Sequence, residues 1–166
     1  MQLVAYGAQD IYLTGNPQIT FFKVVYRRHT NFSMESIQQT WNGTLSATAA
    51  SRATATISRN GDLISRMYLE SLNLDTGTDN HGAVLIDNVT LEIGGQQIDK
   101  HTGSWMEAWA ELTEPNPSGN VGLGNTEAGT VFQRMAAMGG YTDGNPTATD
   151  KHFIPLRFWF CENPGL

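Results

Sequence analysis

The chain has 166 residues, of which 40% are hydrophobic and only 16% are charged; this suits one domain, or one domain with an arm, and excludes a disordered chain. Its ten Lys and Arg residues are outnumbered by sixteen Asp and Glu residues, giving a net charge of −6, which disfavours a protein that coats nucleic acid by neutralising phosphates. A single Cys excludes an internal disulfide framework and a Cys-based zinc cage, and no apolar run approaches the roughly 18 residues of a membrane span.

Two strand candidates come first, over residues 18–26 and 32–41. The first is rich in β-branched and aromatic residues, and the second alternates apolar with polar side chains. The basic cluster of the chain comprises Lys23 in the first candidate and Arg27, Arg28 and His29 directly after it. This cluster is a candidate contact for nucleic acid or for a partner, but a solvated turn after a strand is the favoured interpretation.

The first predicted hairpin joins residues 52–58 to residues 63–74. Small or apolar side chains alternate with polar ones in its first strand, which is the period of a half-buried strand. Asn60-Gly61 follows, and this pair supplies the positive-φ residues of a type I′ turn. The expected core positions of the returning strand are Ile64, Met67 and Leu69.

A second hairpin is predicted from an apolar strand over residues 84–93. Gly94-Gly95 forms a two-residue turn, and residues 96–99 return as the partner strand. A polar loop over residues 75–82 separates the two hairpins.

Two short helices are predicted after the second hairpin. The first begins at Ser104, whose hydroxyl has capping-box spacing to Glu107, and it ends at Glu114-Pro115. The second covers residues 127–138 and ends at Gly139-Gly140. The expected core faces are Trp105, Ala108, Trp109 and Leu112 in the first helix and Val131, Phe132, Met135 and Met138 in the second.

The last predicted strand covers residues 153–161, which are nearly all apolar or aromatic and therefore typical of a strand buried on both faces. Within it, Arg157 needs a partner or a route to solvent. Many short strands, Gly-rich turns and a helical excursion between strands together predict an all-β fold, an antiparallel sandwich or jelly roll.

No motif predicts a catalytic, cofactor or metal site. Asp75-Thr76-Gly77 has the triplet of an aspartic protease, in which two Asp carboxylates share one proton, but Asp87 stands where such a fold needs Gly, and an ordinary loop is favoured. The same loop offers Asp75, Asp79, Asn80 and His81 as weak cation ligands without calcium-loop spacing. Cys161 is predicted to be a buried hydrophobe.

Three Asn-Xaa-Ser/Thr sequons begin at Asn31, Asn42 and Asn88. Asn42 is the best placed of the three, at a predicted turn, whereas Asn88 falls inside a predicted strand. The first seven residues lack the basic and apolar regions of a signal peptide, which argues against host-type glycosylation of all three.

Three blocks of sequence are specific enough to indicate a family, beyond the strand and turn patterns that they contain. They read GAQDIYLTGNPQITFFK and YRRHTNF over residues 7–23 and 26–32, IGGQQIDKH over residues 93–101, and PLRFWFC followed by NPGL over residues 155–161 and 163–166. In order, and over essentially the whole chain, they resemble the major capsid proteins of the nucleocytoplasmic large DNA viruses, the algal-virus, mimivirus and iridovirus group.

The resemblance implies a structural protein without catalysis or cofactor. Family members have two jelly rolls side by side and form homotrimers of pseudo-hexagonal outline, which tile an icosahedral shell with neighbouring capsomers and minor capsid proteins. An internal membrane separates this shell from the genome, so direct contact with nucleic acid, membrane insertion and a small-molecule ligand are not expected. The expected location is the virion shell, assembled in the cytoplasm of the infected cell.

Two segments are expected from this resemblance. Residues 1–31 would be an N-terminal arm for inter-subunit contacts, and residues 32–166 would be the first jelly-roll domain. The candidate contact residues of the arm are Tyr12, Phe22, Lys23, Arg27 and Arg28.

The chain departs from the family in two respects. Glu162 stands where the family usually has Arg, and the chain stops at Leu166, where family members continue into another strand and then a second jelly roll. With six or seven strand candidates against about eight in a jelly roll, the sheet is expected to lack its last strands. The chain is then a fragment of a longer product, which is favoured, or it completes its sheet by strand exchange.

Two other functions stay open on the residues alone. A jelly-roll carbohydrate-binding module would use the loops over residues 74–82 and 114–126. A dimeric aspartic protease would use Asp75 and is the less favoured of the two.

Overall fold

The computed structural model describes residues 7–8, 24–26, 30–46, 49–72, 79–115, 130–141 and 151–162. Within these ranges the chain forms three two-stranded antiparallel sheets. They pair β1 (Trp41–Asn42) with β2 (Thr54–Ala55), β3 (Met67–Leu72) with β6 (Lys151–Leu156), and β4 (Asn88–Ile93) with β5 (Gln96–Thr102). The helices are α2 (His81–Val84), α3 (Gly103–Thr113), α4 (Val131–Ala136) and α5 (Trp159–Glu162).

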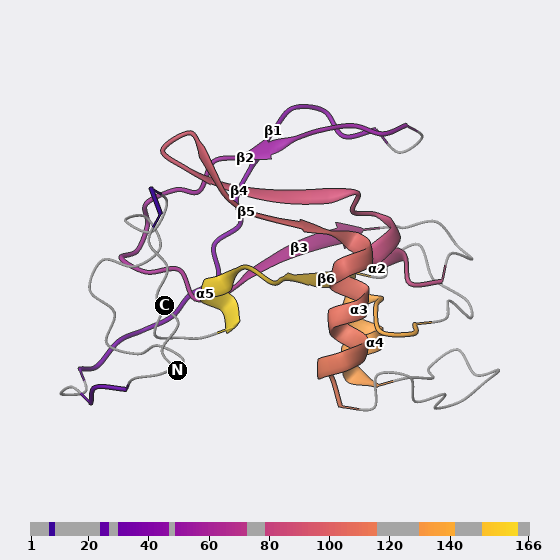
Figure 1. Ribbon diagram of the computed structural model, residues 1–166. Helices are drawn as coiled ribbons and strands as arrows, with labels where there is room; N and C mark the ends of the chain where they lie inside the picture. The colour runs from indigo at the N-terminus through magenta and orange to yellow at the C-terminus, as the bar shows by residue number, and fades with distance from the viewer. Residues whose placement is uncertain are drawn as a thin grey trace.

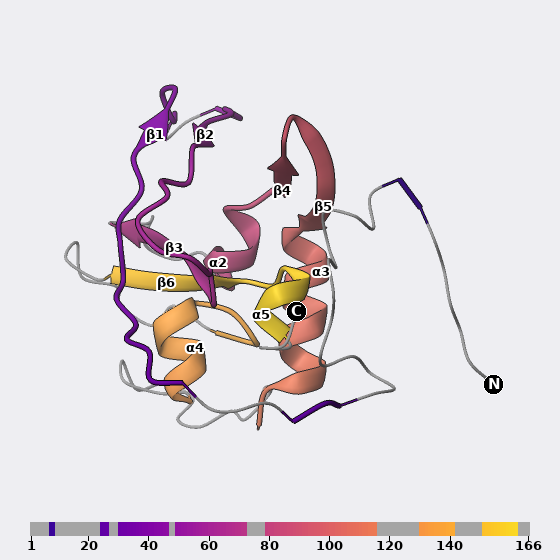
Figure 2. The same ribbon diagram turned by 90° about the vertical axis from the view of Figure 1, so that its left-hand side faces the viewer.

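The β3–β6 sheet lies in the middle of the molecule. The β1–β2 and β4–β5 pairs lie on one side of it and α4 lies on the other, while α3 runs from the end of β5 toward the side of α4 (Figures 1 and 2). None of the helices in the described ranges has the length and hydropathy needed to cross a membrane.

The core lies where α2, α3 and α4 meet the β3–β6 sheet. Its buried cluster comprises Ala83, Ile86, Met106, Ala136, Met138 and Ile154. Backbones approach one another closely beside this cluster. A Cβ atom added to Gly103 would lie 2.0 Å from the carbonyl oxygen of Ala83, and one added to Gly82 would lie 2.2 Å from that of Ala136. Only glycine permits approaches as close as these.

The turn predicted at Gly94-Gly95 is confirmed. Both glycines have positive φ, 61° and 80°, as a two-residue hairpin turn requires, and β4 and β5 pair across them. The strand predicted over residues 84–93 is shorter than expected, because its first part belongs to α2 and to the turn that follows. Ile86 in that turn is nevertheless buried in the core.

The hairpin predicted at Asn60-Gly61 is wrong. Neither residue has a positive φ, and β3 pairs with the distant β6 while β2 pairs with β1. The reason is burial: β6 brings Ile154, which is 0% exposed, into the core, and the hydrophobic gain from that position outweighs a local turn preference. As a result, Ile64 lies outside β3 and is half exposed.

The strands predicted before residue 52 are only partly confirmed. Of residues 32–41, only Trp41 is in a strand, whereas Phe32 and Met34 are exposed in irregular chain. The alternation predicted over residues 52–58 is confirmed, since side chains 53, 55 and 57 are half-buried and their neighbours are exposed. The strand predicted over residues 18–26 falls mostly outside the described residues.

Both predicted helices exist; the expected core face of α3 is wrong, and that of α4 is confirmed only in part. In α3 the N-cap is Thr102, whose side chain accepts from the Trp105 amide, and not Ser104. The buried residues of α3 are Gly103, Met106 and Ala110, whereas Trp105 and Leu112 are exposed. At Gly103 the neighbouring backbones lie too close for any side chain, whereas Met106 is one of the largest fully buried side chains.

Of the expected core face of α4, Met138 is buried in the core just beyond the helix and Phe132 packs against it, whereas Val131 and Met135 are exposed. Within the helix the buried residues are Gln133 and Ala136. The helix starts at a capping box between Thr130 and Gln133. It ends earlier than predicted, at Ala137 in the left-handed conformation.

The strand predicted over residues 153–161 is β6 only as far as Leu156. Side chains in β6 alternate, with His152 and Ile154 buried and Phe153 partly exposed, so the strand is not buried on both faces. The aromatic residues that follow form the single turn of α5. The predicted end of α3 at Glu114-Pro115 is confirmed, with Glu114 as its C-cap.

Candidate functional site

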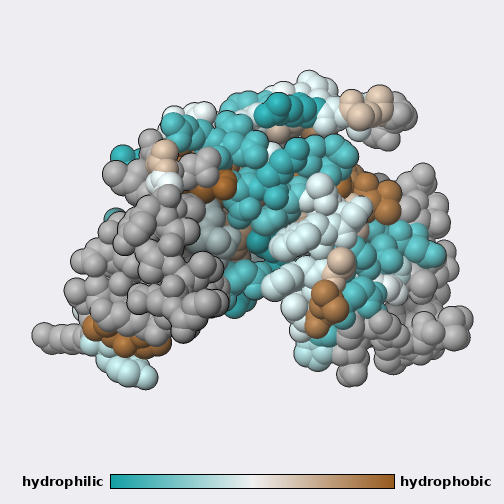
Figure 3. All heavy atoms as spheres, viewed as in Figure 1, coloured by the Kyte–Doolittle hydropathy of each residue, from teal (hydrophilic) through white to brown (hydrophobic). Residues whose placement is uncertain are grey.

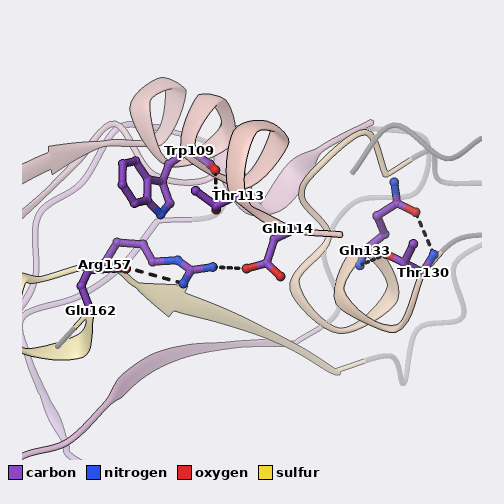
Figure 4. A network of polar contacts seen from close by, with 7 residues as sticks. All are labelled: Trp109, Thr113, Glu114, Thr130, Gln133, Arg157 and Glu162. Atoms are coloured by element: carbon purple, nitrogen blue, oxygen red, sulfur yellow. Dashed lines mark hydrogen bonds and ion pairs between the residues drawn. The ribbon is translucent and has the colours of Figure 1, made fainter. Parts of the chain in front are cut away.

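Arg157, directly after β6, is held between two carboxylates (Figure 4). Its Nη2 donates to Oε1 of Glu114 at 2.5 Å, and its Nη1 lies 3.8 Å from Oε1 of Glu162. The side chains of Arg157 and Glu114 are only 21% and 24% exposed. The guanidinium fork suits two carboxylates at once, so it joins the end of α3 to α5. Glu114 is therefore the main partner that Arg157 was predicted to need.

The two carboxylates are expected to differ in their contribution to stability. Arg157→Gln should lower the free energy of unfolding by about 1–3 kcal/mol, because it leaves the Glu114 carboxylate partly buried without its cation. Glu162→Gln should cost less than about 1 kcal/mol, because that contact is longer and more exposed. Urea denaturation followed by Trp fluorescence measures both, and equal losses would contradict Glu114 as the main partner.

A cavity of about 260 Å³ opens beside this ion-pair junction, between β3, the end of β6 and α5. Arg66, Tyr68 and Cys161 line it together with the Arg157–Glu114 pair. Burial raises the pKa of the Cys161 thiol, and hydrogen bonds with the backbone at Met67 and Phe158 lower it to a lesser extent. A raised pKa disfavours the thiolate, which is the nucleophilic form. The prediction of a buried Cys161 is confirmed only in part, because the residue is half-buried in α5 and lines the cavity beside charged side chains.

Alkylation of Cys161 by iodoacetamide is expected to be several-fold slower in the folded chain than in the chain unfolded in urea. Because the pKa is raised, less thiolate is present at any pH near neutrality than in an ordinary cysteine. Mass spectrometry of timed samples at pH 7.5 measures the rate. Equal rates in the two states would show that the thiol is open to solvent.

A stack of aromatic rings lies between β5, α3 and the segment after β6. The ring of His101 stacks on Trp105 at 4.5 Å, and Trp105 stacks on Trp109 at 5.5 Å. His101 also stacks on the buried Phe158 at 5.3 Å. Trp105 is 40% exposed, so the stack presents apolar surface to solvent. The stacking of His101 and Trp109 on the Trp105 ring holds that ring in place. Rigid aromatic surface of this kind is typical of protein contacts.

Many other large apolar side chains are exposed over the described residues. They form scattered patches on the face seen in Figure 3. Exposed apolar surface of this extent is typical of chains that bury it against other chains. The most exposed are Tyr26, Phe32, Met34, Leu63, Val84, Leu112 and Val131.

Glu107 forms a second polar contact of α3, which the sequence analysis missed because it assigned this residue to a capping box. Both of its carboxylate oxygens accept from the Gly139 amide at 3.0 Å, and Oε1 also accepts from the Gly140 amide at 3.1 Å. On the other side of this turn, Gln133 Nε2 donates to the Gly139 carbonyl at 2.6 Å. The only sequence signal for this contact was the Gly139-Gly140 pair itself.

The predicted contact residues Tyr12, Phe22, Lys23, Arg27 and Arg28 all lie outside the described residues. The same holds for the triplet over residues 75–77 and for most of the two loops considered for carbohydrate.

The three sequon asparagines, Asn31, Asn42 and Asn88, are all exposed. The side chains of Asn42 and Asn88 contact neighbouring polar side chains. Asn42 Nδ2 lies 3.5 Å from Thr56 Oγ1, and Asn88 Nδ2 donates to Asp87 at 2.6 Å.

The residues considered for a weak cation site are not brought together at the surface. His81 is only 4% exposed, and its ring packs edge-on against Tyr141 and His152 in the interior. Asn80 takes a left-handed conformation and precedes α2. In the described part of the chain, no group of three His, Cys, Asp or Glu side chains is arranged to hold a metal ion.

Comparison with known proteins finds one family whose pattern, described as major capsid protein N-terminus, matches residues 20–166. The chain is 53% identical over 171 residues to the major capsid protein of Pyramimonas orientalis virus and 47% identical over 195 residues to that of Phaeocystis pouchetii virus. It is 44% identical over 172 residues to that of Paramecium bursaria Chlorella virus 1. These matches cover 99–100% of this chain but only 36–41% of the relatives.

Two solved structures share the fold. A quasi-atomic model of the PBCV-1 virus capsid is similar with a TM-score of 0.66 at 36% identity, over 89% of this chain and 33% of that chain. The crystal structure of PBCV-1 VP54, fitted into a reconstruction of the virophage Sputnik, gives a TM-score of 0.65 at 37% identity, with the same coverage. The predicted all-β jelly-roll class is confirmed by this likeness.

Proposed function

The chain belongs to the major capsid protein family, whose N-terminal part it matches, and from this premise we propose that it is a structural building block in the shell of a large icosahedral DNA virus. The observation that carries this proposal is the family match over residues 20–166. The proposed location is the virion shell, and the proposed role there is mechanical. The chain spans less than half the length of these relatives.

The surface chemistry supports assembly with other chains. Charged residues make up only 16% of the sequence, and exposed aromatic and aliphatic side chains are spread over the described surface. Depletion of charge and enrichment of aromatic residues are features of the cores of protein interfaces. The proposed assembly is a homotrimer of pseudo-hexagonal outline that contacts neighbouring capsomers and minor capsid proteins.

Two parts of the chain have different proposed roles. Residues 32–166 supply the first jelly roll, and residues 1–31 act as an arm between subunits. Tyr12, Phe22, Lys23, Arg27 and Arg28 are the proposed arm contacts, since they offer aromatic area and positive charge to partners that carry the same net negative charge as this chain.

Sedimentation velocity of the chain over a concentration series tests this function. Association with rising concentration, up to a species of three times the 18.2-kDa chain mass, is the expected result. A monomer at every soluble concentration would contradict the proposal. Specific binding on a glycan array would favour the carbohydrate-binding alternative instead.

A further inference from the structure

The turn that follows α4 has the backbone of an anion-binding site. Ala137, Gly139 and Gly140 all have positive φ, at 51°, 73° and 81°. The amides of Gly139 and Gly140 converge on one acceptor, Oε1 of Glu107. Consecutive amides that point into one concavity form a nest, which is a recurrent site for anions in proteins.

The anion that occupies this nest comes from the chain itself. Glu107 lies 32 residues before Gly139, on α3, and in the described part of the chain no Lys, Arg or His pairs with it. Its negative charge is therefore stabilised by backbone amides and solvent. Hydrogen bonds between amides and an ionised group are roughly twice as strong as neutral ones.

The opposite side of the turn is held by Gln133, which is only 2% exposed. Its Oε1 accepts from the Thr130 amide at 2.8 Å (Figure 4), and its Nε2 donates to the Gly139 carbonyl at 2.6 Å. The amide side and the carbonyl side of Gly139 are thus both fixed by side chains, one from α3 and one from α4. Such a turn has little freedom to take another shape while Glu107 stays in place.

We propose that the Gly139–Gly140 amide pair is an anion-binding site that the chain fills with its own Glu107 carboxylate. This contact acts as a latch that holds the end of α4 on α3, next to the core residues Met106 and Met138. When Glu107 is removed, the nest is vacant and takes a small free carboxylate in its place. The latch is independent of the assembly proposed above.

Chemical rescue tests the site. In Glu107→Ala, sodium formate should raise the midpoint of thermal unfolding relative to sodium chloride of equal ionic strength. Wild type and the control Glu35→Ala should show no such difference, because Glu35 is exposed and lies outside the nest. Equal effects of formate on all three proteins, or none on Glu107→Ala, would overturn the proposal.

A second variant covers the case in which Glu107→Ala does not fold. Glu107→Gln keeps the shape and one acceptor oxygen but removes the charge, so hydrogen exchange at the Gly139 and Gly140 amides should be about tenfold faster than in wild type. Glu35→Gln should leave both rates unchanged. Exchange rates equal to wild type in Glu107→Gln would show that the carboxylate does not hold these amides.

Discussion

Gly103→Ala is expected to lower the free energy of unfolding by about 3 kcal/mol or more, the largest loss foreseen for a single methyl group in this chain. The new Cβ would lie 2.0 Å from the carbonyl oxygen of Ala83 and 2.3 Å from that of Ile86. Both contacts are with backbone, so no side-chain rotation relieves them. The Gly103 amide also donates to the Ile86 carbonyl at 3.1 Å, and separating the two segments would break that bond.

Gly61→Ala is the matched control for this substitution. No atom lies within 4 Å of a Cβ at Gly61, and its φ is not positive. It should therefore change stability by no more than about 0.5 kcal/mol. Thermal or urea unfolding of the two variants measures the difference, and a Gly103→Ala protein as stable as Gly61→Ala would refute the close approach of α3 to the turn after α2.

Phe158→Ala is expected to cost about 3–5 kcal/mol, because it removes a large buried ring and leaves a cavity. Phe158 is 1% exposed, and its ring stacks on His101 and lies 6.0 Å from Phe160. The loss would reach the surface as well, since His101 in turn supports Trp105. Near-ultraviolet circular dichroism should therefore lose part of its Trp signal even under conditions where the variant stays folded.

Phe153→Ala serves as the control for Phe158→Ala. The residue lies in β6, but it is 37% exposed and so buries much less apolar area. Its loss should be well under half that of Phe158→Ala in the same urea titration. Equal losses at the two positions would mean that the segment after β6 does not enter the core.

Local features of the fold were predictable because they depend on neighbouring residues. The turn at Gly94-Gly95 follows from the ability of glycine to take positive φ, and the end of α3 follows from Pro115, which disfavours helix at Glu114. The need of Arg157 for a partner was equally plain, since a guanidinium in an apolar run must be paired or solvated. Its partner Glu114 could not be named, because 43 residues separate the two.

The core face of α3 was mispredicted for a physical reason. Trp105 and Leu112 are the larger side chains of α3, and hydrophobic area alone would turn them inward. The close approach of neighbouring backbones at Gly103 turns that side of α3 inward, and Met106 and Ala110, which lie on the same side of the helix, are buried with it. Such steric limits arise only once the helix has been placed against its neighbours.

By itself, the sequence determined the family, the all-β class, the glycine turn between β4 and β5 and the existence of the two helices α3 and α4. These conclusions rest on residue identity and on interactions within a few positions along the chain. Only the tertiary structure decided that β3 pairs with β6, which helix faces are buried, and that Glu107 binds the turn after α4. The β3–β6 pairing and the Glu107 contact join segments about 30 to 90 residues apart. Which distant segments meet depends on the burial and packing of the whole core, and the conformational preferences of neighbouring residues do not determine it.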